Sequence, residues 1–232
     1  MQRHSFFGAS SPQNKTYYTM STTQHINNES HVTPYRQLLK ERILDTAMEQ
    51  FARRGIRAVR MDDLAQNLGI SKRTLYEIYA NKEDLLYEGV KKYHAKRLEE
   101  NRRIVEGAGN VMDILLMLYR HSVTELRKVV PSFYSELERY KKVVDYLHAE
   151  DKRRFGERKA FVERGVEEGY FRKDINVELV LHFFEAIGFH ALREDLFSKY
   201  SIDDIYNSVV FLSLRGLCTE KGQKRMDQFF AK

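Results

Sequence analysis

Hydrogen-bonding side chains gather directly after the glycine at position 69. They recur with the spacing of one helix surface, close to the predicted N-terminus of that helix. The residues are Lys72, Arg73, Thr74, Tyr76 and Tyr79. Such groups donate to phosphate oxygens and base edges, and a helix N-terminus adds N–H groups that favour phosphate. This pattern predicts a recognition helix that lies in the major groove of double-stranded DNA.

The charge around this helix agrees with that chemistry. Between positions 52 and 82 the chain has seven Lys or Arg residues and three acidic residues, whereas the whole chain carries a net charge of +6. A local basic excess is what phosphate binding requires, although a solvated helix face can have the same composition.

Two short helices must position these side chains. Apolar residues with i, i+3, i+4, i+7 spacing predict the first helix, and its members are Met61, Leu64, Ala65 and Leu68. Gly69 tolerates the positive φ of a tight turn, and Ser71 can cap the second helix. The predicted buried seam is Leu64, Leu68, Ile70, Leu75 and Ile78. We therefore predict a helix-turn-helix at Met61–Tyr79; the alternative is two unrelated helices in a bundle.

Helical periods also cover most of the remaining chain, which predicts an all-α protein. A helix should begin at Pro34 and end at Gly55, and another should begin after Asn81 and end near Val105. The later helices are expected at 111–130, 132–140, 142–168, 177–196 and 202–217. The expected organisation is a disordered tail (1–33), a DNA-binding domain (34–80), a connecting helix (81–105) and a regulatory and dimerisation domain (106–232). If Met20 is the true start, residues 1–19 are not translated.

The stretch Gly69–Leu86 resembles the signature of tetracycline-repressor (TetR) family regulators, as do Met61–Ala65 and the helix from Ile43 to Gly55. The resemblance is specific over Tyr35–Val90, and beyond it only the helical layout is similar. It implies a three-helix DNA-binding domain followed by a larger helical domain that dimerises and binds a small-molecule inducer.

The resemblance also implies roles for single residues. Lys72, Arg73 and Thr74 would approach base edges or phosphates, Tyr76 and Tyr79 would contact the DNA backbone, and Lys82 would hold a phosphate. Family members commonly have Ser or Thr before the second helix, where this chain has Arg60, which we expect to reach the DNA backbone. The predicted DNA-binding set is Arg60, Ser71, Lys72, Arg73, Thr74, Tyr76, Tyr79 and Lys82. The alternative interpretations are that Tyr79 belongs to the core and that Arg73 is a solvated surface residue.

The second half of the chain is rich in aromatic residues and histidines. An apolar cavity with a few polar groups is what an inducer site needs, although the same residues suit a helical core. The candidate ligand-binding residues are Tyr119, Tyr134, His182 and Phe183. His182 and His190 share a helix face but lack a third ligand, so we predict no metal and no cofactor. No catalytic constellation stands out, which argues against an enzyme.

The last two predicted helices are the candidates for a dimer interface. Their apolar and small residues are Ile187, Gly188, Ala191, Val209, Leu212, Gly216 and Leu217. The resemblance implies a four-helix interface between two chains, and a symmetric dimer would need a pseudo-palindromic operator. A ligand that prefers a dimer with misplaced recognition helices would then release the DNA.

The only cysteine is Cys218, and no apolar run approaches the length of a membrane span or a signal peptide, so we expect a cytoplasmic protein. The leading hypothesis is a ligand-released repressor. The alternatives are an inducer-independent DNA-binding protein acting in chromosome organisation, an enzyme carried on the helical domain, and a helical protein-interaction module.

Overall fold

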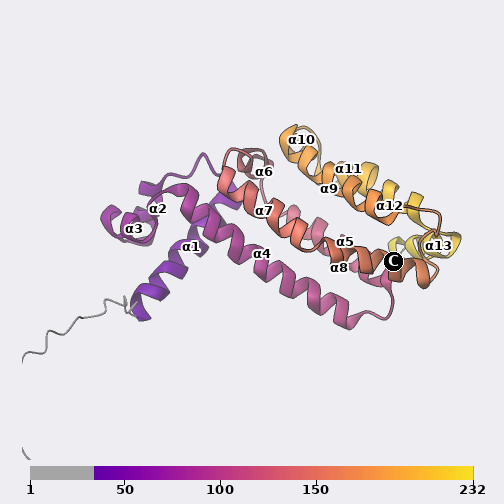
Figure 1. The fold of residues 1–232 in the computed structure, drawn as a ribbon. Helices are drawn as coiled ribbons and strands as arrows, with labels where there is room; N and C mark the ends of the chain where they lie inside the picture. The colour runs from indigo at the N-terminus through magenta and orange to yellow at the C-terminus, as the bar shows by residue number, and fades with distance from the viewer. Residues whose placement is uncertain (1–33, 232) are drawn as a thin grey trace, which may run out of the picture. The chain divides into compact units, whose positions relative to one another are not determined.

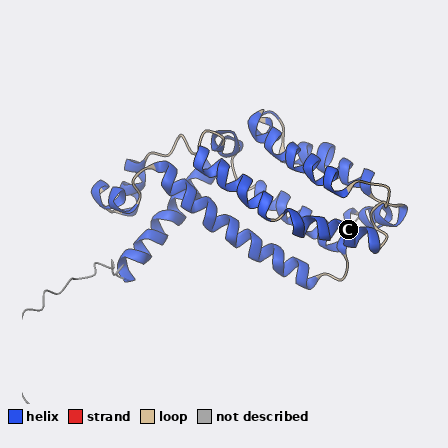
Figure 2. Ribbon diagram, in the orientation of Figure 1, coloured by secondary structure: helices blue, strands red, loops and turns tan. Residues whose placement is uncertain are grey.

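The computed structural model of the protein describes residues 34–231, so the predicted tail (1–33) lies outside the described residues. Figure 2 shows that the described part is built from helices. Its one β-type pairing is an isolated antiparallel bridge between Phe171 and Cys218. The predicted all-α class is confirmed. None of the described helices is both long and apolar enough to cross a membrane.

The first helices enclose one core. α1 (Pro34–Arg54), α2 (Met61–Leu68) and α3 (Lys72–Ile78) lie together at one end of the long α4 (Lys82–Gly107) (Figure 1). Gly55 ends α1 with φ of 82°, as the sequence predicted. Fully buried apolar side chains fill the space between these helices; they include Ile43, Phe51, Leu64, Leu75 and Leu85. Burial of each such side chain contributes about 1.5–3 kcal/mol, so this core fixes the position of α3.

The remaining helices form the larger part of the described chain. They are α5 (Val111–Leu126), α6 (Pro131–Leu137), α7 (Lys141–Arg153), α8 (Phe155–Glu167), α9 (Val177–Arg193), α10 (Leu196–Lys199), α11 (Ile202–Ile205), α12 (Leu212–Leu217) and α13 (Glu220–Phe230). A π-helical turn, η1 (Tyr206–Phe211), joins α11 to α12. A second core cluster contains Val111, Met112, Leu116, Phe171, Cys218 and Met226.

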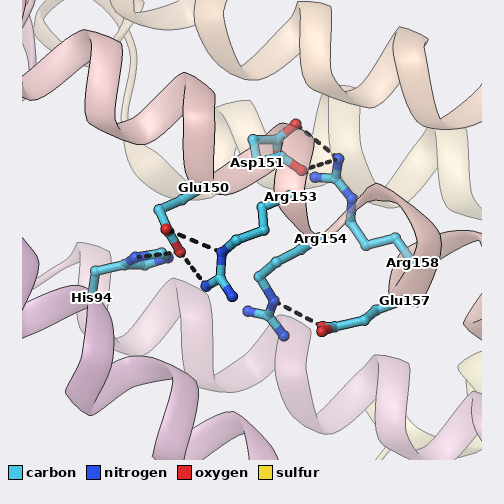
Figure 3. Close-up of polar contacts among 7 residues, drawn as sticks. All are labelled: His94, Glu150, Asp151, Arg153, Arg154, Glu157 and Arg158. Carbon is cyan, nitrogen blue, oxygen red and sulfur yellow. Dashed lines mark hydrogen bonds and ion pairs between the residues drawn. The ribbon is translucent and has the colours of Figure 1, made fainter.

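The predicted helix over 142–168 is wrong as a single element, because the chain breaks at Arg154 into α7 and α8. The break allows α7 to pack on α4 while α8 packs on α5 and α9. Figure 3 shows the polar contacts at this corner: Arg158 on α8 pairs with Asp151 on α7, and Glu150 lies between Arg153 and His94 of α4. Burial lowers the pKa of His94, and the nearby Arg97, Arg153 and Arg154 lower it further.

The C-terminal region also departs from the expectation. The predicted helix over 202–217 contains the π-helical turn, and α13 was not predicted. Thr219 caps α13 by accepting from the backbone N–H of Gly222, and a side chain at Gly222 would collide with the carbonyl oxygen of Tyr170. Met226 is fully buried, so tertiary packing stabilises this helix despite its glycine and its polar composition.

A short contact region joins α6 to the loop after α1. The backbone N–H of Val130 donates to the carbonyl of Ala52 over 2.8 Å, and the N–H of Arg57 donates to the Glu136 carboxylate over 2.7 Å. Gly55 lies so close to Ser132 that an added Cβ would come within 2.7 Å of its Oγ. The loop before α2 is therefore held directly by α6.

Candidate nucleic-acid interface

The turn between α2 and α3 depends on Gly69, which adopts a left-handed conformation with φ of 65°. Its N–H donates to the carbonyl of Gln66, and the N–H of Ile70 donates to the carbonyl of Ala65. These bonds satisfy the last carbonyls of α2 in the way a left-handed C-cap does. Ala65 is buried, which permits the two helices to approach closely. The predicted geometry of the turn is confirmed.

Ser71 caps α3, as the sequence predicted. Its Oγ accepts from the backbone N–H of Thr74 over 3.0 Å, and it lies 2.8 Å from the Thr74 hydroxyl. The cap fixes the start of α3 relative to the turn. Both hydroxyls therefore stand at the N-terminus of the helix, where backbone N–H groups attract phosphate.

Three longer side chains project from α3. The Lys72 ammonium pairs with Asp62 on α2, and this hydrogen bond raises the pKa of Lys72. The Arg73 side chain is 89% exposed and pairs with Glu77 over 2.8 Å. Tyr76 is 46% exposed. The two basic groups lie at the surface in weak ion pairs, which phosphate can replace at low cost.

Arg60 occupies the N-cap position of α2 with an extended backbone, and its side chain makes no capping hydrogen bond. It is exposed, and among the described residues it has no ion pair. Asp62 and Asp63 in the first turn interact favourably with the helix dipole instead. The guanidinium of Arg60 is therefore available to a backbone phosphate.

Tyr79 and Lys82 lie differently from the other predicted contacts. Tyr79 is 3% exposed, its hydroxyl donates to the carbonyl of Lys40 over a long 3.5 Å, and burial raises its pKa. The Lys82 ammonium donates to the carbonyls of Ile56 and Val59 at 2.9 and 2.8 Å. Burial lowers the pKa of Lys82. In this structure both polar groups are engaged inside the domain.

Sequence reasoning did not single out two arginines on α1. Arg42 donates to the carbonyl of Leu68 over 2.6 Å, and Arg36 donates to the carbonyl of Glu77 over 3.3 Å. These carbonyls belong to the last turns of α2 and α3, where a cation is favoured. Both arginines therefore hold the two helices from the side of α1. Only their spacing of six residues could have suggested a shared role, and that signal is weak.

The four candidate ligand-binding residues do not meet at one site. Tyr119 packs against Tyr206, Phe211 and Phe230, and Tyr134 packs against Phe133 and Phe197. His182 stacks on Phe155 at the surface. Phe183 is 53% exposed and lines a groove of about 580 Å³ between α6, α7 and α9.

A capped short helix that a glycine turn presents at the surface, with basic and phenolic side chains, is the arrangement of helix-turn-helix DNA-binding regulators. The family model described as "Bacterial regulatory proteins, tetR family" matches residues 43–88. The HTH-type transcriptional repressor KstR2 of Mycobacterium tuberculosis is 31% identical over 157 residues, which cover 65% of this chain and 78% of that protein. The chain therefore belongs to the TetR family, and it is a DNA-binding transcriptional regulator.

Solved structures share the fold. A putative transcriptional regulator from Saccharomonospora viridis in complex with choline has a TM-score of 0.65 at 20% identity, covering 79% of this chain and 100% of that one. The transcriptional regulator FadR from Bacillus subtilis in complex with stearoyl-CoA has a TM-score of 0.57 at 19% identity, covering 76% and 98%. At this identity the likeness concerns the fold alone.

Proposed function

We propose that the protein is a dimeric repressor that binds a pseudo-palindromic operator and is released by a small-molecule inducer. The observation that carries the proposal is α3, whose capped N-terminus and exposed Lys72 and Arg73 stand beside the Gly69 turn. Similarity to KstR2, which is named a repressor, supports repression. The choline and stearoyl-CoA complexes of similar folds support control by a ligand. Nothing observed favours a role in chromosome organisation. The protein would act in the cytoplasm, where bacterial DNA lies.

The proposed interface with DNA divides the predicted set in two. Arg60, Ser71, Lys72, Arg73, Thr74 and Tyr76 would contact DNA directly. Tyr79 and Lys82 would first have to leave their partners inside the domain. The proposed domains are residues 34–80 for DNA binding, 81–105 for the connection and 106–232 for regulation and dimerisation.

The proposed dimer interface is an apolar face formed by Val209 of η1 and Leu212 of α12. Leu212 is 64% and Val209 36% exposed in the single chain. Gly188 and Gly216 have no atoms near the position of an added Cβ, which leaves room for a second helix. Exposed apolar patches of this kind mark interfaces. Ala191 is buried within its own chain and would not contribute.

Genomic footprinting with the purified protein tests the proposal. We expect protection of a pseudo-palindromic site, and Lys72→Ala should weaken binding to that site by roughly ten-fold or more if Lys72 reads a base. Lys152→Ala is the matched control, because Lys152 is exposed and has no ion pair within residues 34–231. Protection without sequence preference, or equal binding by both variants, would contradict the proposal.

A further inference from the structure

The groove between α6, α7 and α9 has apolar walls. Val144 and Ile187 line it together with the exposed ring of Phe183. His148 stacks on Phe189 with ring centroids 3.6 Å apart and planes 14° apart. A volume of about 580 Å³ lies within the range of small-molecule sites, and apolar walls with few polar groups are typical of them. Flat apolar molecules suit such a surface because they can stack on its rings.

The polar groups of the groove determine the orientation in which a ligand would bind. Arg193 and His190 both line the groove from the last turn of α9, with Arg193 Nη2 3.3 Å from His190 Nδ1. The Arg193 side chain is 65% exposed, and its link to Glu194 is long, at 3.3 Å. An arginine fork matches the two oxygens of an acidic group. Glu138 lines the groove from α6 and would repel an acid there, so the acidic group belongs beside Arg193.

The groove is also next to the contact that holds the DNA-binding domain. Leu137 and Glu138 line it, and they directly follow Glu136, whose carboxylate accepts from the backbone N–H of Arg57. A molecule in the groove therefore touches the same short helix that holds the loop before α2. A site at this position can bias the placement of α2, because α6 contacts α1 and Glu136 holds Arg57 in the loop that leads into α2.

We infer that the groove binds a flat apolar molecule with one acidic group, and that this molecule is the effector of DNA binding. The inference rests on the proposed function, because an effector requires a regulator. It assigns the acidic group to Arg193 and His190 and the apolar body to the walls around Phe183 and Ile187. The chemical class is an apolar aromatic acid of drug-like size.

Two dyes that differ by one sulfonate test the inference. 8-Anilinonaphthalene-1-sulfonate is acidic, and N-phenyl-1-naphthylamine is its neutral counterpart. We expect Arg193→Gln to raise the Kd of the acidic dye about ten-fold and to leave that of the neutral dye unchanged. Ala186→Trp should weaken both dyes, because Ala186 is exposed and lines the groove. Lys152→Gln, on the outer surface of α7, should change neither.

Two results would overturn the inference: acidic-dye binding that survives Ala186→Trp, or Arg193→Gln weakening both dyes equally. DNA binding by the same preparations, measured without dye on the footprinted fragment, separates the two proposals. If every variant binds DNA like the wild type and the dyes do not discriminate, only the groove assignment fails. If the wild type binds no specific DNA, the proposed function itself fails.

Discussion

Lys82 is a residue for which an experiment can decide between a structural role and a DNA contact. The sequence predicts that it holds a phosphate, whereas the structure places its ammonium between the carbonyls of Ile56 and Val59 at 2.9 and 2.8 Å. These carbonyls belong to the loop that leads into α2, and Lys82 begins α4. Lys82→Met keeps the length and apolar stem of the side chain and removes only the charge-assisted hydrogen bonds.

The expected loss follows from those two bonds. Hydrogen bonds to charged groups contribute about 1.5–3 kcal/mol each, but Lys82 is only half-buried and water can replace part of them in the variant. We expect the free energy of unfolding to fall by about 2 kcal/mol. For a chain of this length that corresponds to a decrease in Tm of about 4–8 °C.

Thermal unfolding and the salt dependence of DNA binding together decide between the two roles. A lysine that neutralises a phosphate contributes about 0.9 to the slope of log K against log salt. We expect Lys82→Met to lower the Tm and leave that slope unchanged, and Lys72→Met to show the reverse. A Lys82→Met protein with an unchanged Tm and a slope reduced by about one would refute the structural assignment.

Three further predictions concern single residues. Gly55→Ala should cost about 3 kcal/mol of unfolding free energy, because of its positive φ and its approach to Ser132. Gly169→Ala, at φ of 75° with no atom within 4 Å of an added Cβ, should cost about 1 kcal/mol; equal losses in denaturant titrations would contradict the contact with α6. Burial raises the pKa of Cys218 to about 11. At pH 8 its thiol should therefore react with Ellman's reagent only as the protein unfolds. Rapid reaction of the native protein would be inconsistent with this burial. The pKa of His94 is lowered, so the folded state disfavours protonation of its ring. Stability that is present above pH 6.5 should therefore be lost as the pH falls through the folded-state pKa. His94→Gln should flatten this loss between about pH 7 and 5, and parallel stability curves for the variant and the wild type would disprove it.

The DNA-binding part of the chain could be predicted from the sequence because its local signals agree with its tertiary structure. Gly69 adopts the positive φ that its position demanded, Ser71 caps α3, and Asn81 caps α4. Each signal concerns a few neighbouring residues, which is the range over which sequence patterns are informative.

The later helices were harder to predict because contacts between distant parts of the sequence determine where they begin and end. Gly156 lies two residues after the break at Arg154, but a single glycine inside a helical pattern is a weak stop signal, and the break exists because α7 and α8 pack on different helices. Met226 and Gly222 belong to a core assembled from segments more than 50 residues apart in the chain, so the periodicity of α13 alone was too weak to predict it. The groove likewise combines residues from α6, α7 and α9, none of which carries a motif.

A count of basic residues cannot distinguish which of them bind DNA and which hold the domain together. Arg42 and Lys82 each donate to main-chain carbonyls that the helix ends and the loop before α2 leave without partners. Lys72 and Arg73 instead lie on α3, where exposed carboxylates are their only described partners, and phosphate can compete for them. The position of a basic residue relative to a free carbonyl therefore predicts its role better than its place in a basic segment. Among the four basic residues of the predicted DNA-binding set, this criterion keeps Arg60, Lys72 and Arg73 as proposed DNA contacts and assigns Lys82 a structural role.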